Sequence, residues 1–159
     1  QGKMNPMSTM NANKPLPYAD ETFRGFLDRL RSEKELVDIK QPVDSRHIAT
    51  LVDQSDKALL FHKVIGYNMP VVSGIIRSQK RAIMSMGCET YPEIEFRLER
   101  GIANPIAPRY VESCAAKQVI QTGKDVDLFS LPIPMFSIYD GGPMITAGIT
   151  IARDPEYGL

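Results

Sequence analysis

Residues 20–40 (DETFRGFLDRLRSEKELVDIK) decide the fold, because within them a helical pattern of apolar residues changes to a strand pattern. The apolar residues of the first part are spaced i, i+3, i+4 and i+7, which predicts one buried stripe of a helix with Asp20 as its N-cap. They are Phe23, Phe26, Leu27 and Leu30. The alternation in residues 36–40 (LVDIK) then predicts a strand, which Pro42 ends.

Outward from this stretch, short strands and helices alternate up to residue 103. Apolar runs predict further strands at residues 58–61 (ALLF) and 71–76 (VVSGII). The expected helix starts carry capping residues, namely Ser45, Ser78, and Thr90 with Glu93 in a capping box. We therefore expect a mixed α/β fold (α+β mixed), with a small N-terminal α/β domain over residues 20–119.

The two ends of the sequence differ from this unit. Residues 1–19 have no hydrophobic period and begin with Gln1-Gly2, which resembles a tag-cleavage remnant, so we expect a disordered extension. Residues 120–159 are expected to hold a linker and the start of a β-rich unit, with a strand at residues 144–152 (MITAGITIA). A lone strand exposes its backbone, so we expect either that the sequence is cut short after Leu159 or that this strand docks on the preceding unit.

Composition excludes several classes of protein. Nineteen Lys and Arg balance nineteen Asp and Glu, which argues against nucleic-acid partners and against polybasic membrane modules. No apolar run approaches the roughly 18 residues of a membrane span, and we find no secretory signal. Cys88 and Cys114 are too few for a disulfide scaffold and fit a reducing cytosol, so we expect a cytoplasmic protein.

Histidines and cysteines offer little chemistry by themselves. His47 and His62 lack companions at metal-ligand spacing, so structural or surface roles are favoured. Cys88 follows a helix with no histidine nearby in sequence to activate it, so we expect a small buried side chain. Cys114 has no motif, and without a Cys/His cluster a zinc site is not expected.

Two charged groups fall on predicted helices. Basic residues at the start of one helix could bind phosphate. Their positive charges are unfavourable beside the positive end of the helix dipole, so we interpret these residues as part of a solvent-exposed face. These residues are Arg77, Lys80 and Arg81. The next helix carries charges that we also assign to a solvent face. These are Glu93, Glu95, Arg97, Glu99 and Arg100.

The third group of candidates surrounds the last predicted strand. Residues 140–143 (DGGP) are interpreted as a tight turn, because they precede a strand and match no phosphate-binding motif. Thr146 and Thr150 share one face of the strand, with Gly148 between them. Small and hydroxylated residues would let a flat ligand approach, but Thr is also common in strands, so both readings stay open.

Three pieces of the last third form an ordered set, namely residues 131–134 (LPIP), residues 140–148 (DGGPMITAG) and residues 152–158 (ARDPEYG). Read in this order, they resemble the UbiD family of reversible decarboxylases that use prenylated flavin mononucleotide. Earlier pieces agree in order and spacing, so the resemblance spans about residues 20–159. It implies that the α/β domain leads into a split β-barrel that binds the flavin. It also implies that manganese and potassium hold the cofactor phosphate in the parent protein.

The resemblance implies one site residue in this chain. Thr146 matches a threonine that lines the cofactor site in relatives. The metal-binding Asn would follow Leu159, and the family's catalytic and metal-binding residues lie further on, so we assign no catalytic and no metal-binding residue.

We therefore expect the N-terminal portion of an enzyme that reversibly decarboxylates an aromatic or α,β-unsaturated acid without oxidation. The parent is expected to be a homo-oligomer, and the fragment is expected to be inactive and to bind no cofactor by itself. Two alternatives stay open, namely a non-catalytic assembly module and a generic FMN-binding split barrel.

Overall fold

Helix α1 (Phe23–Ser32) opens the computed structural model, which describes residues 22–149 and 154–158. Its N-cap is Thr22, whose hydroxyl accepts a hydrogen bond from the Gly25 N–H at 3.1 Å. The expected cap, Asp20, lies outside the described residues. The stripe is confirmed on its inner side, since Phe26, Leu27 and Leu30 are buried and Phe23, in the first turn, is exposed.

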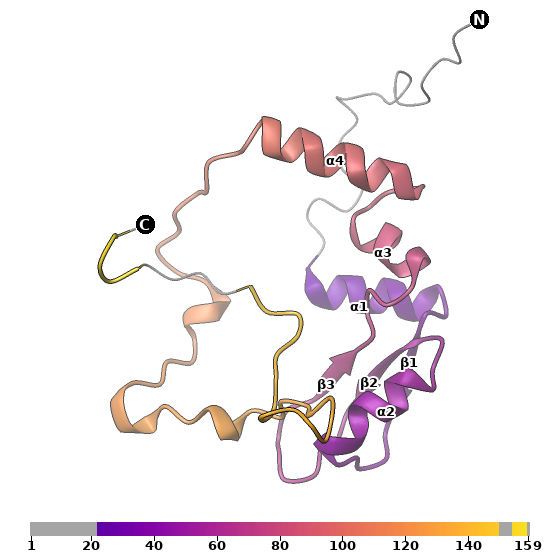
Figure 1. Ribbon diagram of the computed structural model, residues 1–159, viewed down its shortest axis with the longest axis vertical. Coiled ribbons are helices and arrows are strands. Elements are labelled where there is room, and N and C mark those ends of the chain that lie inside the picture. Colours follow the sequence, from indigo (N-terminus) through magenta and orange to yellow (C-terminus); the bar gives the residue numbers. More distant parts are fainter. Residues whose placement is uncertain (1–21, 150–153, 159) are drawn as a thin grey trace, which may run out of the picture.

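A three-stranded sheet in the order β1-β2-β3 forms the centre of the unit. Strand β1 (Leu36–Ile39) runs parallel to β2 (Ala58–Phe61), and α2 (Ile48–Asp53) lies on the connection between them. Strand β3 (Val71–Ser73) pairs with β2 in the antiparallel direction. Figure 1 shows the sheet between α1 on one side and α2 on the other, so the mixed α/β fold is confirmed.

The apolar run of β2 is continuous because both faces of this strand are covered. Ala58 and Leu60 belong to a core cluster that includes the buried residues of α1. Leu59 and Phe61 belong to a second cluster, which includes Ile48 and Val52 of α2. A strand alternates its side chains between two faces, so a strand with helices on both faces loses the polar alternation of a half-exposed strand.

Two predicted boundaries are wrong. Strand β3 ends at Ser73 and does not reach Ile76, because Gly74 turns the chain with a φ of +77°. The second helix is not capped by Ser45. Instead, Asp44 accepts the Arg46 N–H at 2.9 Å and starts a short 3-10 turn, η2 (Ser45–His47), which leads into α2.

The next two helix starts agree with the prediction. Helix α3 (Gln79–Ser85) begins after Ser78, whose hydroxyl accepts the Arg81 N–H, and it ends before Gly87, where φ is +60°. Helix α4 (Tyr91–Ala103) begins with the capping box of Thr90 and Glu93. These signals depend on neighbouring residues alone, so the sequence is sufficient to place them.

The predicted strand at residues 144–152 is wrong for its described part, residues 144–149, which form turns and irregular backbone. Thr150, Ile151 and Ala152 lie outside the described residues. Among residues 104–149 and 154–158 the structure contains 3-10 turns but no strand. The turns are η3 (Ala115–Lys117), η4 (Gly123–Asp125) and η5 (Leu128–Ser130). A strand needs a pairing partner for its backbone, and the described residues provide none here. The boundary near residue 120 and the split barrel therefore stay predictions.

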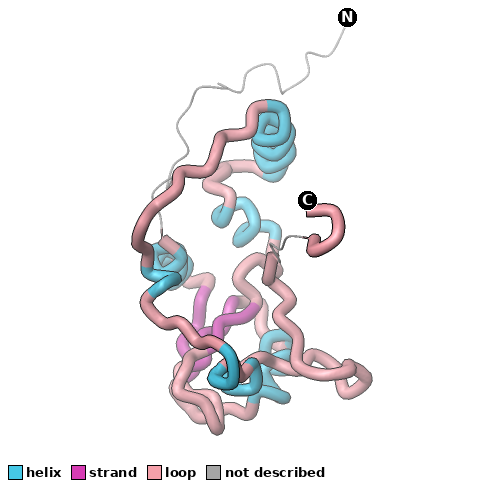
Figure 2. Tube along the Cα trace, turned by 90° about the vertical axis from the view of Figure 1, so that its left-hand side faces the viewer, coloured by secondary structure: helices cyan, strands magenta, loops and turns pink. Residues whose placement is uncertain are grey.

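Two segments follow α4, and we name them for the description below. The connecting segment, residues 104–130, makes a wide arc away from the sheet (Figures 1 and 2). The return loop, residues 131–149, comes back to the sheet beside β3. No helix among the described residues has the length and apolar character to cross a membrane.

Candidate functional site

A pocket of about 300 Å³ lies between β3 and the return loop. One wall consists of residues 69–73, which include β3, and the other consists of residues from the return loop. The return-loop residues that line it are Leu131, Pro132, Ile133, Pro134, Phe136, Met144, Ile145, Thr146 and Ala147. The pocket thus brings residues of two pieces of the last third, residues 131–134 and 140–148, beside β3, which lies far from them along the chain.

The return loop is held in shape by its own hydrogen bonds. The Met144 N–H donates to the Pro134 carbonyl at 3.1 Å, which closes residues 134–144 into a loop. Inside it, the Asp140 carboxylate accepts the Ser137 N–H at 2.8 Å, and the Asp140 N–H donates to the Ser137 carbonyl at 3.1 Å. The hydrogen-bonded turn therefore covers residues 137–140, and residues 140–142 only bend the chain. The tight turn predicted at residues 140–143 is thus found three residues earlier, and the loop brings residues 144–147 back beside residues 131–134.

The chemistry of the pocket is apolar, with a few hydroxyl groups. Proline, isoleucine, valine and methionine side chains supply most of the lining, and Ser73 and Thr146 supply the side-chain hydroxyls. Thr146 is exposed, so its hydroxyl is accessible to a ligand. A concave apolar wall with few polar groups is typical of small-molecule sites.

The basic cluster at the start of α3 consists of two exposed residues, Arg77 and Lys80, and one buried residue, Arg81. Arg81 is 1% exposed and donates to the carbonyl oxygens of Asp56, at 2.7 Å, and Gly74, at 3.0 Å. Its guanidinium also donates to the Glu35 carboxylate at 3.0 Å. Arg77 donates to the carbonyl of Val52 and to the carboxylate of Asp53. The preferred interpretation, a solvated face, is therefore wrong for Arg81, which ties α3 to the ends of the strands.

Glu35 is the acidic partner of this cluster. Lys80 donates to one carboxylate oxygen at 2.8 Å, and Arg81 donates to the other. The hydrogen bond from Lys80, followed by that from Arg81, holds the pKa of Glu35 below its usual value. Lys80 and Arg81 thus share one carboxylate, which links the start of α3 to the residue before β1.

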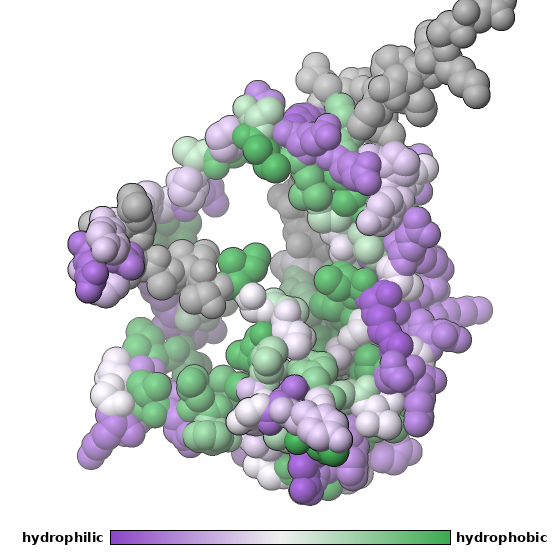
Figure 3. Space-filling view, viewed as in Figure 1, coloured by the Kyte–Doolittle hydropathy of each residue, from purple (hydrophilic) through white to green (hydrophobic). Residues whose placement is uncertain are grey.

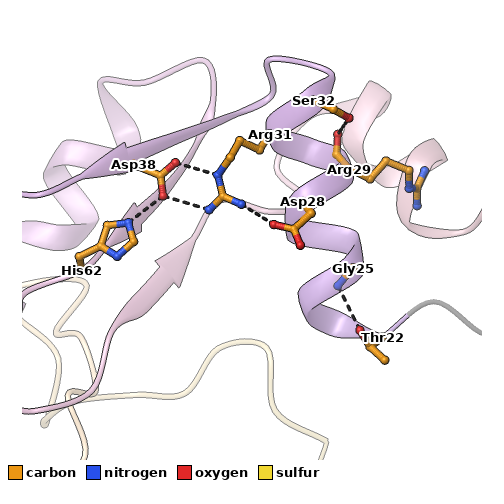
Figure 4. A network of polar contacts seen from close by, with 8 residues as sticks. All are labelled: Thr22, Gly25, Asp28, Arg29, Arg31, Ser32, Asp38 and His62. Carbon is orange, nitrogen blue, oxygen red and sulfur yellow. Dashed lines mark hydrogen bonds and ion pairs between the residues drawn. The ribbon is translucent and has the colours of Figure 1, made fainter.

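His62 joins a second polar network at the edge of the sheet (Figure 4). Its Nε2 lies 2.7 Å from the Asp38 carboxylate, which also accepts two hydrogen bonds from Arg31, at 2.8 and 3.0 Å. The Arg31 hydrogen bonds, assisted by His62, lower the pKa of Asp38 to about 2. Arg31 lies on α1, so this network joins the helix to β1 and to the residue after β2. The structural role predicted for His62 fits these contacts.

The remaining candidates lie apart from the pocket. His47 is exposed at the start of α2, and Cys114 is exposed in the connecting segment. Cys88 is half-buried, and burial raises the pKa of its thiol, which agrees with a structural role. Over residues 22–149 and 154–158, no group of three or more His, Cys, Asp or Glu side chains could hold a metal.

The charges of α4 divide into two groups. Glu95, Glu99 and Arg100 are exposed, as predicted for a solvent face. Glu93 instead accepts the Thr90 N–H in the capping box, and Arg97 donates to the Met86 carbonyl at 2.9 Å. The solvent-face interpretation is therefore wrong for these two residues.

Sequence reasoning missed one wall of the pocket. Residues 71–76 were predicted as a buried strand, whereas β3 is half-buried, and nothing local indicated that the return loop would lie beside it. It also missed the burial of Arg81. The partner that accompanies its burial is Glu35, which lies 46 positions earlier in the sequence. Helical and strand periodicities relate residues only a few positions apart, so they could not pair Arg81 with Glu35.

Comparisons with protein families give two matches. Residues 27–99 match the N-terminal domain of 3-octaprenyl-4-hydroxybenzoate carboxy-lyase, UbiD, and residues 109–159 match the Rift-related domain of the same carboxy-lyase. An uncharacterised protein from the cooM 5' region of Rhodospirillum rubrum is 33% identical over an alignment of 141 residues, which covers 84% of this chain and 30% of that protein. The anhydromevalonate phosphate decarboxylase of Methanothermobacter thermautotrophicus is 28% identical, over 86% of this chain and 31% of that protein.

Solved structures give the same picture. The UbiD-class enzyme HmfF from Pelotomaculum thermopropionicum, in complex with FMN, has a TM-score of 0.75 at 33% identity, over 86% of this chain and 32% of that chain. An evolved dimeric form of HmfF in complex with prFMN has a TM-score of 0.76, at 33% identity, over 86% of this chain and 33% of that one. The vanillic acid decarboxylase of Sedimentibacter hydroxybenzoicus has a TM-score of 0.65 at 26% identity, over 76% of this chain and 29% of that chain. The chain thus spans about a third of the length of the relatives that it matches.

Proposed function

Because the chain belongs to the UbiD family of carboxy-lyases, we propose that it forms part of a decarboxylase that uses prenylated FMN. The reaction is the reversible, non-oxidative removal of a carboxyl group from an aromatic or α,β-unsaturated acid. A homo-oligomeric state and a cytoplasmic location belong to the same proposal. The observation that carries it is the apolar pocket, whose return-loop wall contains both family motifs and Thr146.

The lining of the pocket supports this proposal. Its apolar walls would exclude water from a bound flavin, and the Thr146 hydroxyl would be available to form a hydrogen bond with it. When bound, the prenylated flavin supplies the reactive carbon and the electron sink for the loss of carbon dioxide. The chain's own contribution is to bind and orient the ring edge. Ligands for the phosphate, manganese and potassium belong to the remaining part of the proposed enzyme.

The proposal is tested in a chimera in which residues 22–159 replace the matching third of HmfF. The chimera is produced together with a prenylated-FMN synthase, and bound flavin is measured by absorbance and native mass spectrometry. We expect flavin binding and release of carbon dioxide from the substrate of unmodified HmfF. A folded chimera without flavin, beside a loaded HmfF control, would contradict the proposal.

Thr146 is tested in the same chimera. Thr146→Val keeps the size and removes the hydroxyl, whereas Thr146→Ser keeps the hydroxyl. Loss of one hydrogen bond of about 1.4 kcal/mol weakens binding about tenfold, so flavin occupancy should fall in the valine variant and persist in the serine variant. The melting temperatures of the flavin-free proteins should agree, because Thr146 is exposed. Equal flavin affinity in the two variants would rule out this role.

The chain by itself is expected to remain free of flavin. The native mass of the 159-residue chain, produced beside the same synthase with manganese supplied, should then be that of the bare polypeptide or a multiple of it. An added mass that matches the modified flavin would show that the pocket is sufficient for binding.

A further inference from the structure

Strand β3 lies at one edge of the three-stranded sheet, on the side of the return loop (Figure 1). One side of this strand pairs with β2, and its other side has no strand partner among residues 22–149 and 154–158. All three residues of β3 line the pocket. Backbone groups on the unpaired side of the strand can therefore contact a ligand in the pocket.

The pairing of β2 with β1 decides which backbone groups of β3 point outward. The Ala58 N–H donates to the Glu35 carbonyl at 2.9 Å, and the His62 N–H donates to the Ile39 carbonyl at 3.0 Å. Successive residues of a strand direct their backbone groups to opposite sides. Residues 58, 60 and 62 thus bond to the β1 side, and residues 59 and 61 bond to β3.

Val72 is the residue of β3 whose backbone points outward. It lies opposite Leu60, which bonds to β1, so these two residues form the non-hydrogen-bonded pair of the short β2–β3 ladder. The N–H and C=O of Val72 therefore point away from β2, toward the side where the pocket lies. Within the described part of the chain, no other residue forms a hydrogen bond with either group. A ligand that covers this edge must supply both partners, because buried backbone groups are almost always paired.

The opposite wall is unsuited to pairing with this edge as a strand. Pro132 and Pro134 line that wall, and proline has no N–H to donate. Residues 144–147 also line it, and they form no strand. The pocket of about 300 Å³ lies between the two walls and is at the lower end of the range for ligand sites. A small ring, or one end of a larger ligand, therefore suits the space better than a further strand.

The lining of the pocket is uncharged. None of the described residues that line it is acidic or basic, and Ser73 and Thr146 contribute only neutral hydroxyls. In Figure 3 the surface where the return loop meets the sheet is mostly green and pale, which agrees with this composition. A charged group buried there without a partner would be costly. The part of a ligand that enters the pocket is therefore neutral.

We propose that Val72 binds the N–H/C=O edge of a cyclic amide or imide. In such a ring the N–H lies beside a carbonyl, so the ring N–H donates to the Val72 carbonyl and the ring carbonyl accepts the Val72 N–H. The hydroxyls of Ser73 and Thr146 can serve a second ring carbonyl, because a hydroxyl both donates and accepts. The pyrimidine half of a flavin carries this edge, at its N3–H group between two carbonyls. The inference therefore rests on the proposed function and assigns this half of the ring to β3.

The test compares FMN with 3-methyl-FMN, in which a methyl group replaces the hydrogen on N3. Affinities for the HmfF chimera described above are measured by quenching of flavin fluorescence, which requires neither prenylation nor catalysis. Unmodified HmfF, whose complex with FMN is known, is the positive control. Methylation removes the ring donor, so the chimera should bind 3-methyl-FMN at least about tenfold more weakly than FMN.

Variants at residue 72 show whether its backbone makes the contact. Val72→Pro removes the outward N–H and keeps the ladder hydrogen bonds, since an edge strand tolerates proline where the N–H points outward. Its FMN affinity should fall about tenfold, whereas Val72→Thr keeps the amide and should bind FMN like the unchanged chimera. Methylation of N3 should weaken binding less in Val72→Pro than in the unchanged chimera, because the two changes remove parts of one paired contact. If Val72→Pro does not fold, an ester in place of the Val72 amide gives the same comparison.

Three results would overturn this assignment and leave the proposed function standing, because FMN still binds in each. The first is equal affinity of the chimera for FMN and 3-methyl-FMN. The second is an effect of methylation that is the same with and without the Val72 N–H, which would place the N3 contact elsewhere in the chimera. The third is slow hydrogen exchange of the Val72 amide in the flavin-free chimera, which would assign the edge to a paired polypeptide strand.

A fourth result would overturn the assignment together with the proposed function. It is a folded chimera that binds no FMN under conditions in which unmodified HmfF is loaded.

Discussion

Arg81 is expected to hold the α/β unit together, and replacing it with methionine tests this role. The side chain is buried and joins three positions, namely the carbonyls of Asp56 and Gly74 and the carboxylate of Glu35. Asp56 precedes β2, Gly74 follows β3 and Glu35 precedes β1. One guanidinium therefore links the ends of all three strands to α3.

The magnitude follows from the groups that lose their partner. A buried carbonyl left without a hydrogen bond costs about 1–3 kcal/mol, and Arg81→Met removes the Arg81 donors from two carbonyls. Glu35 keeps Lys80, so its share is smaller. Methionine recovers part of the packing. We expect the free energy of unfolding to fall by about 3 kcal/mol, a large fraction of the 5–15 kcal/mol typical of domains.

Urea unfolding of the full chain, followed by circular dichroism at 222 nm, measures the change. With a slope of about 2 kcal/mol per molar urea, the midpoint should fall by about 1.5 M. Arg81→Lys keeps the charge but lacks the planar fork, so it should lie between wild type and methionine. Arg100→Met is the matched control, because Arg100 is exposed on α4 and should change stability by less than about 0.5 kcal/mol. An unchanged midpoint for Arg81→Met, with an unchanged slope, would refute this reasoning.

Two further predictions concern titration and thiol reactivity. The pKa of Asp38 falls from 3.8 to about 2 in the folded chain, so its contribution to stability is full at pH values well above 3.8 and is lost as pH falls through about 2. After discounting for solvent, we expect about 1 kcal/mol from it. The free energy of unfolding, measured as a function of pH in the acid range, should change less with pH for Asp38→Asn than for wild type. The exposed control Asp125→Asn should follow wild type. Parallel curves for all three proteins would exclude the contribution of Asp38. Iodoacetamide should label the exposed Cys114 faster than the half-buried Cys88, because burial raises the pKa of the Cys88 thiol. Peptide mass spectrometry measures the two labelling rates, and the reverse order would contradict the assigned burial.

Local signals in the sequence were enough for most elements of the α/β unit. The stripe of α1, the run of β2 and the capping box of α4 each depend on residues within a few positions of one another, and all three are confirmed. The motifs at residues 131–134 and 140–148 were enough to indicate the UbiD family, which the family matches confirm. The turn predicted at residues 140–143 was displaced, because the hydrogen-bonded turn covers residues 137–140.

Other features depended on contacts between distant parts of the chain. A strand pattern at residues 144–149 did not produce a strand, because strand formation requires a pairing partner that the described residues do not supply. The extent of β3 depended on the backbone turn at Gly74, and glycine in a sequence permits such a turn without requiring it.

The sequence by itself determined the order of helices and strands up to residue 103 and the family to which the chain belongs. Tertiary structure alone decided that Arg81 is buried against three strand ends, that β3 forms a wall of the pocket beside Thr146, and that the connecting segment stays uncovered. The physical reason is the range of the interactions. Caps and periodicity act within a few residues, whereas burial, ion pairing and pocket formation depend on which distant segments pack together.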